Sequence, residues 1–281
     1  MQKERNVRKI AGRCLVILDT QNLTIRNVTV RESYSWNVQL VRCDKVHVDT
    51  LRIFSSARNS NGDGLDPDGC IDVLIENCLI LSEDDSISPK AAWKPARSPK
   101  NHHVRNCILW AQNATGIAAG DETNSETFSD MLFENVDILR ANTMIRLFVA
   151  DGADMHNITF RNLWIEEYSM HVQDQGFDEH VRFEGANKRT DGQTYLLHAY
   201  VHKRNDASKL GMIRNVLLEN IHAPRAVKAT LTGAQRPDGK TSITGVVMRD
   251  CTVAGVCGKT AADLKASNNE FAEPIKIECT H

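Results

Sequence analysis

The 281-residue sequence lacks several features that would place it in large classes of protein. No apolar run approaches the ~20 residues that cross a membrane, so we expect no membrane partner. The formal net charge of −2 gives no basic field, so we expect no nucleic-acid partner. No cysteine pair or His/Cys cluster has the spacing of a zinc site, so no structural metal is predicted. Residues 1–9 lack the apolar core of a signal peptide, and the sequence leaves localisation open.

The eight cysteines do not suggest a disulfide framework, because the chain is too long to depend on one. Their positions repeat instead. Cys78, Cys107 and Cys251 each follow the same residue of a repeat, and Cys43 and Cys70 share another position. This is the pattern of small hydrophobic side chains stacked inside a repeat protein, so we expect mostly free, buried thiols.

A nine-residue pattern recurs along the chain: an alternating apolar run, a polar residue, then a second short apolar run. Its central residue is, in order, Asn27, Thr50, Asn77, Asn106, Asn135, Asn162, Asn220 and Asp250. The period is about 28 residues, and we interpret the interval of 58 between the last two asparagines as two periods with one degenerate copy. Alternation of two residues within each copy predicts one coil of a parallel β-helix per repeat, since helical repeats need apolar spacings of three and four. The central asparagines are predicted to be structural, because asparagine tolerates the left-handed bend between strands and its amide can bond to the next coil.

Stacked coils bring two acidic segments together. One coil advances by about 4.8 Å, and the inward positions predicted to stack are Leu65, Ile87, Ile117 and Ile145. Two residues earlier stand Asp63, Asp85, Thr115 and Thr143, and one residue later stand Asp66, Ser88, Ala118 and Arg146. We therefore expect Asp63, Asp84 and Asp85 to form one patch, in which mutual repulsion raises at least one pKa. The alternatives are solvated turn acids or a calcium loop, but the twelfth position of such a loop is Cys70 rather than glutamate, and no flanking helices are predicted.

Further side chains are candidates for binding a substrate beside these acids: Lys90, Trp93, Asp66, Asp121, Glu122 and Arg146. Small residues at 114–120 would leave a cleft open on the next coil. Arg146 is expected to bind a hydroxyl or carboxylate of the substrate, or else to pair with Asp66 or Asp121. Trp93 is expected to stack on a sugar ring or to pack within its proline-containing loop.

The motifs resemble those of the polygalacturonase family, glycoside hydrolase family 28, from about residue 13 to about residue 180. The resemblance is carried by the segment 33–40 with Cys43, by Asn61-Gly62-Asp63-Gly64, by Glu83-Asp84-Asp85 and by Lys90. It implies a right-handed parallel β-helix, no cofactor and a glycan substrate. It further implies that Asp84 is the general acid and that Asp63 and Asp85 hold and deprotonate the attacking water, with inversion.

Departures from the family motifs affect the expected substrate. The family histidine, lysine and tyrosine, which help to hold the galacturonate carboxylate, fall on Thr115, Phe148 and Phe177. We therefore expect a glycoside hydrolase that acts on a glycan other than plain polygalacturonate. The alternatives are a dextranase-like hydrolase of neutral glucan, a calcium-dependent β-helix lyase using Arg146 or Lys90, and a non-catalytic glycan-binding β-helix.

The whole chain, residues 1–281, is predicted to be a single, all-β domain: a right-handed single-stranded parallel β-helix of roughly eight to ten coils. The resemblance begins almost at residue 1, so the N-terminal coils and cap of such a helix are expected to be missing. Because an open end exposes unpaired strand edges, we expect upstream sequence or another chain, as in an oligomer, to cover it. The family expectation for localisation is secreted or periplasmic.

Overall fold

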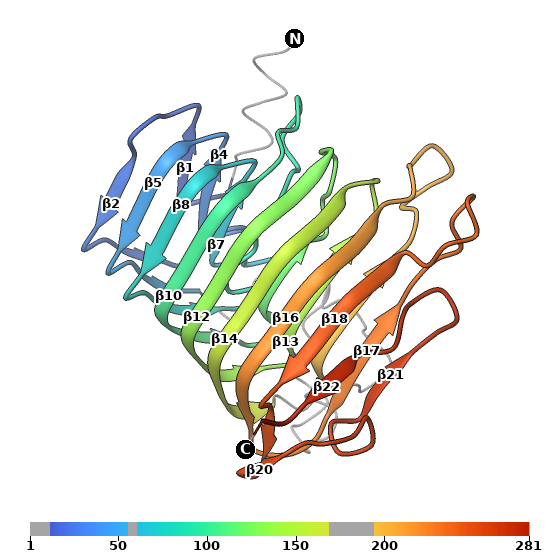
Figure 1. Cartoon of the computed structure of the whole chain (residues 1–281). Coiled ribbons are helices and arrows are strands. Elements are labelled where there is room, and N and C mark those ends of the chain that lie inside the picture. The colour runs from blue at the N-terminus through green and yellow to red at the C-terminus, as the bar shows by residue number, and fades with distance from the viewer. Residues whose placement is uncertain (1–11, 56–60, 169–193, 281) are drawn as a thin grey trace, which may run out of the picture.

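Parallel strands stacked in coils make up the fold. The computed structural model describes residues 12–55, 61–168 and 194–280, and these residues contain strands, bridges and turns but no helix (Figure 1). The described part thus contains no helix that could cross a membrane. The predicted all-β, right-handed parallel β-helix is confirmed.

Three sheets run along the solenoid. The largest has a path of nine strands: β2 (Thr24–Arg26), β5 (Asp44–Asp49), β8 (Ile71–Glu76), β10 (Lys100–Ala111), β12 (Thr127–Ala141), β14 (Asp154–Tyr168), β16 (Met212–Ala223), β18 (Ile243–Arg249) and β22 (Lys276–Glu278). Attached to it are β3 (Thr29–Arg31), β6 (Arg52–Phe54), β9 (Leu79–Ser82), β19 (Thr252–Val253) and β20 (Val256–Cys257). Only β19 and β20 pair antiparallel among the described strands.

The other two sheets form the face that carries the acids. One contains β1 (Leu15–Leu18), β4 (Val38–Val41) and β7 (Leu65–Asp68). The second contains β11 (Thr115–Gly120), β13 (Thr143–Val149), β15 (Tyr195–Val201), β17 (Lys228–Thr232) and β21 (Ala266–Asn268). Single bridges from Leu65 to Ile87 and from Ile87 to Ile117 connect β7 to β11. These two sheets therefore form one continuous wall, here called the site face.

The predicted stacking of inward positions is confirmed along the site face. Ile117 pairs with Ile145, and Ile145 pairs with Leu197 on the following coil. Leu65, Ile87, Ile117 and Ile145 are all fully buried and belong to one hydrophobic cluster that extends through the coils. Because the inward column is fixed in this way, side chains one residue away point outward and meet their counterparts on neighbouring coils.

The central residues of the repeat occupy the bends between strands, as predicted. All eight have φ between 50° and 56°, in the left-handed region. The side-chain amides from Asn77 to Asn220 form a ladder, in which Nδ2 of Asn162 donates to Oδ1 of Asn135 at 3.0 Å and Nδ2 of Asn220 donates to Oδ1 of Asn162 at 2.8 Å. These bonds satisfy polar groups at bends where the regular strand pairing is interrupted.

A second left-handed column stands five residues before the first, and the sequence prediction missed it. It consists of Asn22, Lys45, Asp72, Asn101, Asp130, Asn157, Asn215 and Gly245. Its side chains also bond from coil to coil, for example from Nδ2 of Asn215 to Oδ1 of Asn157 at 2.7 Å. The asparagine and aspartate content of this column was its signal, since these residues tolerate the left-handed region best.

The interval of 58 residues between Asn162 and Asn220 is a single coil, so the prediction of two periods was wrong. β14 pairs directly with β16, and Arg161 stands opposite Glu219. The additional residues therefore lengthen one coil and leave the stacking of the large sheet unchanged.

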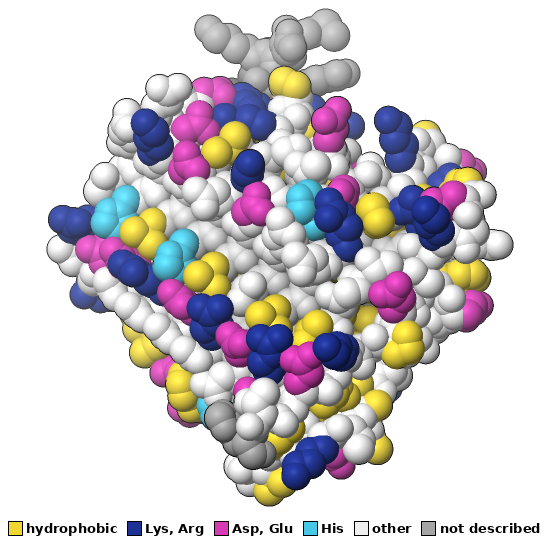
Figure 2. All heavy atoms as spheres, in the orientation of Figure 1, with side chains coloured by type: hydrophobic (Ala, Val, Ile, Leu, Met, Phe, Trp, Pro, Cys, Tyr) yellow, Lys and Arg dark blue, Asp and Glu magenta, His cyan; other side chains and the backbone are white. Residues whose placement is uncertain are grey.

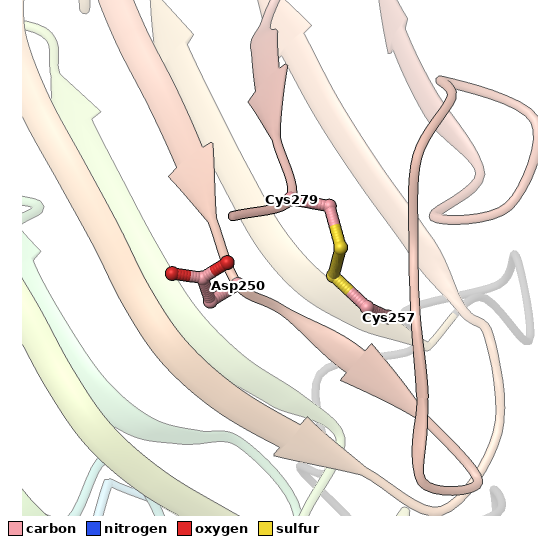
Figure 3. Close-up of side chains that lie close together, drawn as sticks. All are labelled: Asp250, Cys257 and Cys279. Atoms are coloured by element: carbon pink, nitrogen blue, oxygen red, sulfur yellow. A yellow bond between two sulfur atoms is a disulfide. The ribbon is translucent and has the colours of Figure 1, made fainter. Parts of the chain in front are cut away.

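The prediction of mostly free, buried thiols is confirmed with one exception in burial. Five of the six free cysteines are buried, whereas Cys14 is exposed. Cys257 and Cys279 form a disulfide near Asp250, which ties the segment after β22 to β20 (Figure 3). The carboxylate of Asp250 accepts hydrogen bonds from the backbone and hydroxyl of Thr280 at 2.7 and 2.8 Å.

A row of charged side chains crosses the outer surface of the large sheet, one per coil (Figure 2). We call it the charge row, and its residues pair in register from strand to strand: Arg26, Asp49, Glu76, Arg105, Glu134, Arg161, Glu219, Arg249 and Glu278. Acidic and basic residues alternate except where Asp49 stands beside Glu76, and there Nε2 of His47 lies 2.8 Å from Oε1 of Glu76. Opposite charges facing each other across strands favour this register.

Candidate active site

The acidic segments predicted to meet do so on the site face. Asp63 lies two residues before the start of β7, and Asp84 and Asp85 lie between β9 and Ile87 on the next coil. The backbone amide of Gly64 donates to the carbonyl of Asp85 at 2.8 Å. A Cβ atom at residue 64 would lie 2.4 Å from the Ser86 carbonyl oxygen, so glycine permits this approach of two coils.

Lys90 holds the first carboxylate. Its Nζ lies 2.8 Å from Oδ2 of Asp63, 3.6 Å from Oδ1 of Asp66 and 3.6 Å from Oε2 of Glu122. Nζ also lies 4.5 Å from the centre of the Trp36 ring, which covers it on another side. Lys90 is only 3% exposed, and the surrounding carboxylates keep its pKa well above the ordinary value despite burial. Lys90 is therefore a buried cation that organises three acids.

Burial raises the pKa values of Asp63 and Asp66 to different extents. Desolvation raises the pKa of Asp63 to about 6, with Lys90 opposing the rise and Asp85 adding to it. Asp66 is completely buried, and desolvation together with the nearby Asp63 raises its pKa well above the ordinary value. At neutral pH, Asp63 is the group that carries charge opposite Lys90, while the environment of Asp66 favours the neutral acid.

Arg146 holds the carboxylate of Asp85. Its Nη2 donates to Oδ2 of Asp85 at 2.6 Å and also to the carboxylate of Asp121. Oδ1 of Asp85 accepts a hydrogen bond from the backbone amide of Thr115 at 3.0 Å. Arg146 and Asp85 are 3% and 2% exposed. Of the two sequence expectations for Arg146, the geometry favours pairing with Asp121 over direct binding of a substrate.

Asp84 differs from its two neighbours because no cation binds its carboxylate among the described contacts. It is partly exposed, and Oδ1 accepts a hydrogen bond from the backbone amide of Asp85 at 3.0 Å. Desolvation, then repulsion from Asp85 and Asp63, raises its pKa to about 8. Asp84 is therefore protonated at neutral pH and accessible from the surface, as a proton donor must be.

The remaining sequence candidates lie at different depths. Asp121 and Glu122 are partly exposed and contact Arg146 and Lys90 respectively. Trp93 is 8% exposed, and its backbone amide donates to Asp68, so the geometry favours loop packing over sugar stacking. Phe177 lies outside the described residues.

Sequence reasoning missed a supporting group on the N-terminal side of the site. Asp68 is buried, and its carboxylate accepts hydrogen bonds from Nε2 of Gln39 at 2.9 Å and from the amide of Ala92 at 2.8 Å. The Arg13 guanidinium donates to Oε1 of Gln39 and lies 4.3 Å from the centre of the Trp36 ring. The available signal was the spacing, since Asp68 is two residues after Asp66 and therefore points to the same side of the strand.

A row of aromatic rings continues the site face beyond Arg146, and sequence reasoning missed most of it. Phe148, at the position where the family has lysine, stacks on Tyr200 with ring centres 4.1 Å apart and on His202 at 4.7 Å. His198 stacks on both Tyr195 and Tyr200, at 4.4 and 4.6 Å. The signal was Tyr195, His198, Tyr200 and His202 in one short segment. Aromatic rings at this position offer apolar surface where a cation would favour a carboxylate.

Acidic side chains outnumber basic ones in this cluster, here called the acidic centre. Seven acidic side chains meet here, and they are Asp63, Asp66, Asp68, Asp84, Asp85, Asp121 and Glu122. Burial favours the neutral form of Asp66 and Asp84, which leaves five acidic side chains facing three cations. The cations are Arg13, Lys90 and Arg146, of which the last two are buried and already paired. Such a centre repels an anionic group placed directly on it.

The fold and the acid cluster together are typical of β-helix enzymes that act on polysaccharides. The sequence profile of the glycosyl hydrolases family 28 matches residues 2–179, and the chain belongs to this family. A probable polygalacturonase from Vitis vinifera is 27% identical over 141 residues, which cover 48% of this chain and 28% of that protein.

Solved structures show the same fold. A hyperthermoactive exopolygalacturonase from Thermotoga maritima matches with a TM-score of 0.64 and 18% identity, covering 92% of this chain and 53% of that chain. A family 28 exopolygalacturonase from Yersinia enterocolitica matches with a TM-score of 0.59 and 15% identity, covering 90% of this chain and 47% of that one. The chain thus spans about half the length of these two enzymes.

Proposed function

We propose that this chain hydrolyses an O-glycosidic bond of a polysaccharide or oligosaccharide by an inverting acid/base mechanism. The observation that carries the proposal is the difference between Asp84, whose carboxylate binds no cation among the described contacts and whose pKa is raised to about 8 by burial, and the cation-bound Asp63 and Asp85 beside it. Membership of glycoside hydrolase family 28 supports the reaction class.

In this mechanism Asp84 donates its proton to the glycosidic oxygen as the bond to the leaving sugar breaks. Asp63 and Asp85 hold a water molecule on the opposite side of the sugar ring, and one of them accepts a proton as the water attacks the anomeric carbon. Lys90 keeps Asp63 ionised, and Arg146 orients Asp85 through a charge-assisted hydrogen bond. No cofactor is needed for these steps.

The sugar at the point of cleavage is proposed to be neutral, rather than the galacturonate of plain polygalacturonate. Thr115 and Phe148 stand where the family has a histidine and a lysine, and Phe148 belongs to the aromatic row. The acid excess of the centre supports the same conclusion, because an added carboxylate would raise the electrostatic energy of the bound state.

The test is release of reducing ends from a panel of plant and bacterial glycans, with neutral glucans and oligogalacturonides included. Asp84→Asn should lower the rate by about a hundredfold or more, the usual contribution of a general acid. Glu270→Gln is the matched control, because Glu270 is exposed on a turn after β21 and lies outside both the acidic cluster and its neighbouring loops, and it should retain full activity. Unchanged activity in Asp84→Asn would refute the assignment.

The non-catalytic alternative makes a different prediction for the same proteins. If the chain only binds glycans, neither the wild type nor Asp84→Asn releases reducing ends, and both bind the same members of the panel. Inversion is tested separately, by following the anomeric configuration of the first product by NMR. A product with the configuration of the substrate would contradict the water-based mechanism.

A further inference from the structure

A second concave region lies beside the acidic centre and has the opposite charge. It is a cleft of about 1080 Å³ between the loops that follow Lys90, β11, β13 and β15. Five cationic side chains line it, against the acids Glu126 and Asp151, and these cations are Lys94, Arg97, Lys100, Arg204 and Lys209. We call this region the basic cleft.

The five cations are not equally available to a ligand. Arg97 is held by Asp44, with Nη2 2.8 Å from Oδ1, and Arg204 is held by Asp151, with Nε 2.9 Å from Oδ1. Lys94 and Lys209 are exposed, and no carboxylate of the described residues lies within ion-pair distance of either. The cleft therefore combines a fixed frame of paired arginines with two lysines whose charge is uncompensated.

The basic cleft and the catalytic centre share a wall. Asp121 connects the two regions. Its backbone carbonyl accepts a hydrogen bond from Arg204, and its carboxylate accepts one from Arg146, which also binds Asp85. Thr123 joins the same loops, because its hydroxyl accepts from the amides of Ala150 and Asp151 at 3.0 and 2.9 Å. The segment from Asp121 to Thr123 therefore stands between the acidic centre and the basic cleft, with one region on each side of it.

We propose that the basic cleft is a subsite for an anionic sugar, carboxylated or sulfated, in a glycan whose neutral sugar lies at the catalytic acids. The binding of an anion follows from the charges of the cleft alone. Its place in a cleaved substrate rests on the proposed hydrolytic function. Such a substrate carries its charge unevenly: its anionic sugar is excluded from the acidic centre and is bound by Lys94 and Lys209 at a distance from it.

Binding is tested with three dextrans of equal chain length: uncharged, carboxymethylated and sulfated. Titration calorimetry at low and at physiological salt measures each dissociation constant. The wild type should bind a charged dextran at least about tenfold more tightly than the uncharged one, and the difference should shrink as salt rises. The carboxymethyl and sulfate probes show which anion the cleft prefers.

The discriminating variant is the double charge reversal K94E/K209E. The matched control is K240E/K259E, which changes the net charge equally at exposed lysines outside the cleft. We expect K94E/K209E to lose the preference for charged dextran and K240E/K259E to retain it. Equal loss in both variants, or no loss in either, would overturn the proposal.

Repeating the titrations with Asp84→Asn separates this inference from the proposed function. Binding of charged dextran that depends on Lys94 and Lys209 establishes the anionic subsite whether or not reducing ends are released. Reducing-end release from neutral glycans without any preference for charged dextran supports hydrolysis and refutes the subsite.

Discussion

Nη2 of Arg146 lies 2.6 Å from Oδ2 of Asp85, and the two residues are separated by 61 positions in the sequence and by one intervening coil. Both side chains are almost fully buried. The pair therefore connects non-adjacent coils across the site face, and it fixes the position of Asp85, one of the two carboxylates proposed to hold the attacking water.

Replacing Arg146 by methionine is expected to destabilise the protein by about 3–5 kcal/mol, because Asp85 loses its partner while remaining buried. The matched control is Arg249→Met in the charge row, whose side chain is 37% exposed and pairs with Glu219 and Glu278. That variant should cost about 1 kcal/mol or less. Urea denaturation measures both, and equal losses would show that burial of the Arg146 pair is unimportant.

The rate of hydrolysis should depend on pH as a bell-shaped curve. The proposed mechanism requires Asp63 to be ionised and Asp84 to be protonated, and their pKa values are about 6 and about 8. kcat/KM should therefore rise through pH 6 and fall through pH 8, since this ratio reports the free enzyme. A profile without the alkaline decline would exclude Asp84 as the general acid.

The proton on Asp84 also predicts how stability changes with pH. The folded-state pKa of about 8 lies above the ordinary value of 3.8, so between these values the folded protein binds a proton that the unfolded chain has lost. This difference favours the unfolded state increasingly as pH rises from about 4 to about 8. Asp84→Asn removes the titration and should raise the free energy of unfolding at pH 8 by about 1 kcal/mol or more relative to its effect at pH 4. Urea denaturation at both pH values tests this, and an effect independent of pH would contradict the raised pKa.

The asparagine ladder offers a test of the fold. Asn135 has φ 52°, accepts from Asn162 and donates to Asn106. Asn135→Ala loses both the tolerance of the left-handed region and the hydrogen bonds, and should cost about 2–3 kcal/mol. Asn135→Gly restores the backbone freedom alone and should cost about half as much. Thermal unfolding compares the two variants; an equal loss would assign the whole effect to the side-chain bonds.

The repeat could be predicted from the sequence because each coil obeys the same local rules. Alternating apolar residues identify strands, and asparagine identifies a left-handed bend, so Leu65, Ile87, Ile117 and Ile145 could be aligned without coordinates. The interval before Asn220 could not be resolved in this way. A long excursion within one coil and a degenerate coil add similar numbers of residues, and only strand pairing distinguishes them.

The sequence predicted which acids of the site come together, but it did not predict how the cations bind them. The spacing of Asp63 and Asp85 follows from the repeat, which also placed Arg146 on the correct face. Arg146 is buried and binds both Asp85 and Asp121. The sequence pattern shows which face a side chain is on, but it does not show how deeply that side chain is buried. The basic cleft could not be predicted from the sequence, because Lys94 and Lys209 are more than one hundred residues apart.

The charge row on the large sheet constrains how such a chain can lengthen or shorten during evolution. Because acidic and basic residues alternate from coil to coil, duplication or deletion of a single coil would place two like charges opposite each other. A change of two coils would preserve the alternation. The pairing of Asp49 with Glu76, where His47 supplies the missing partner, is the arrangement that a change of one coil would leave.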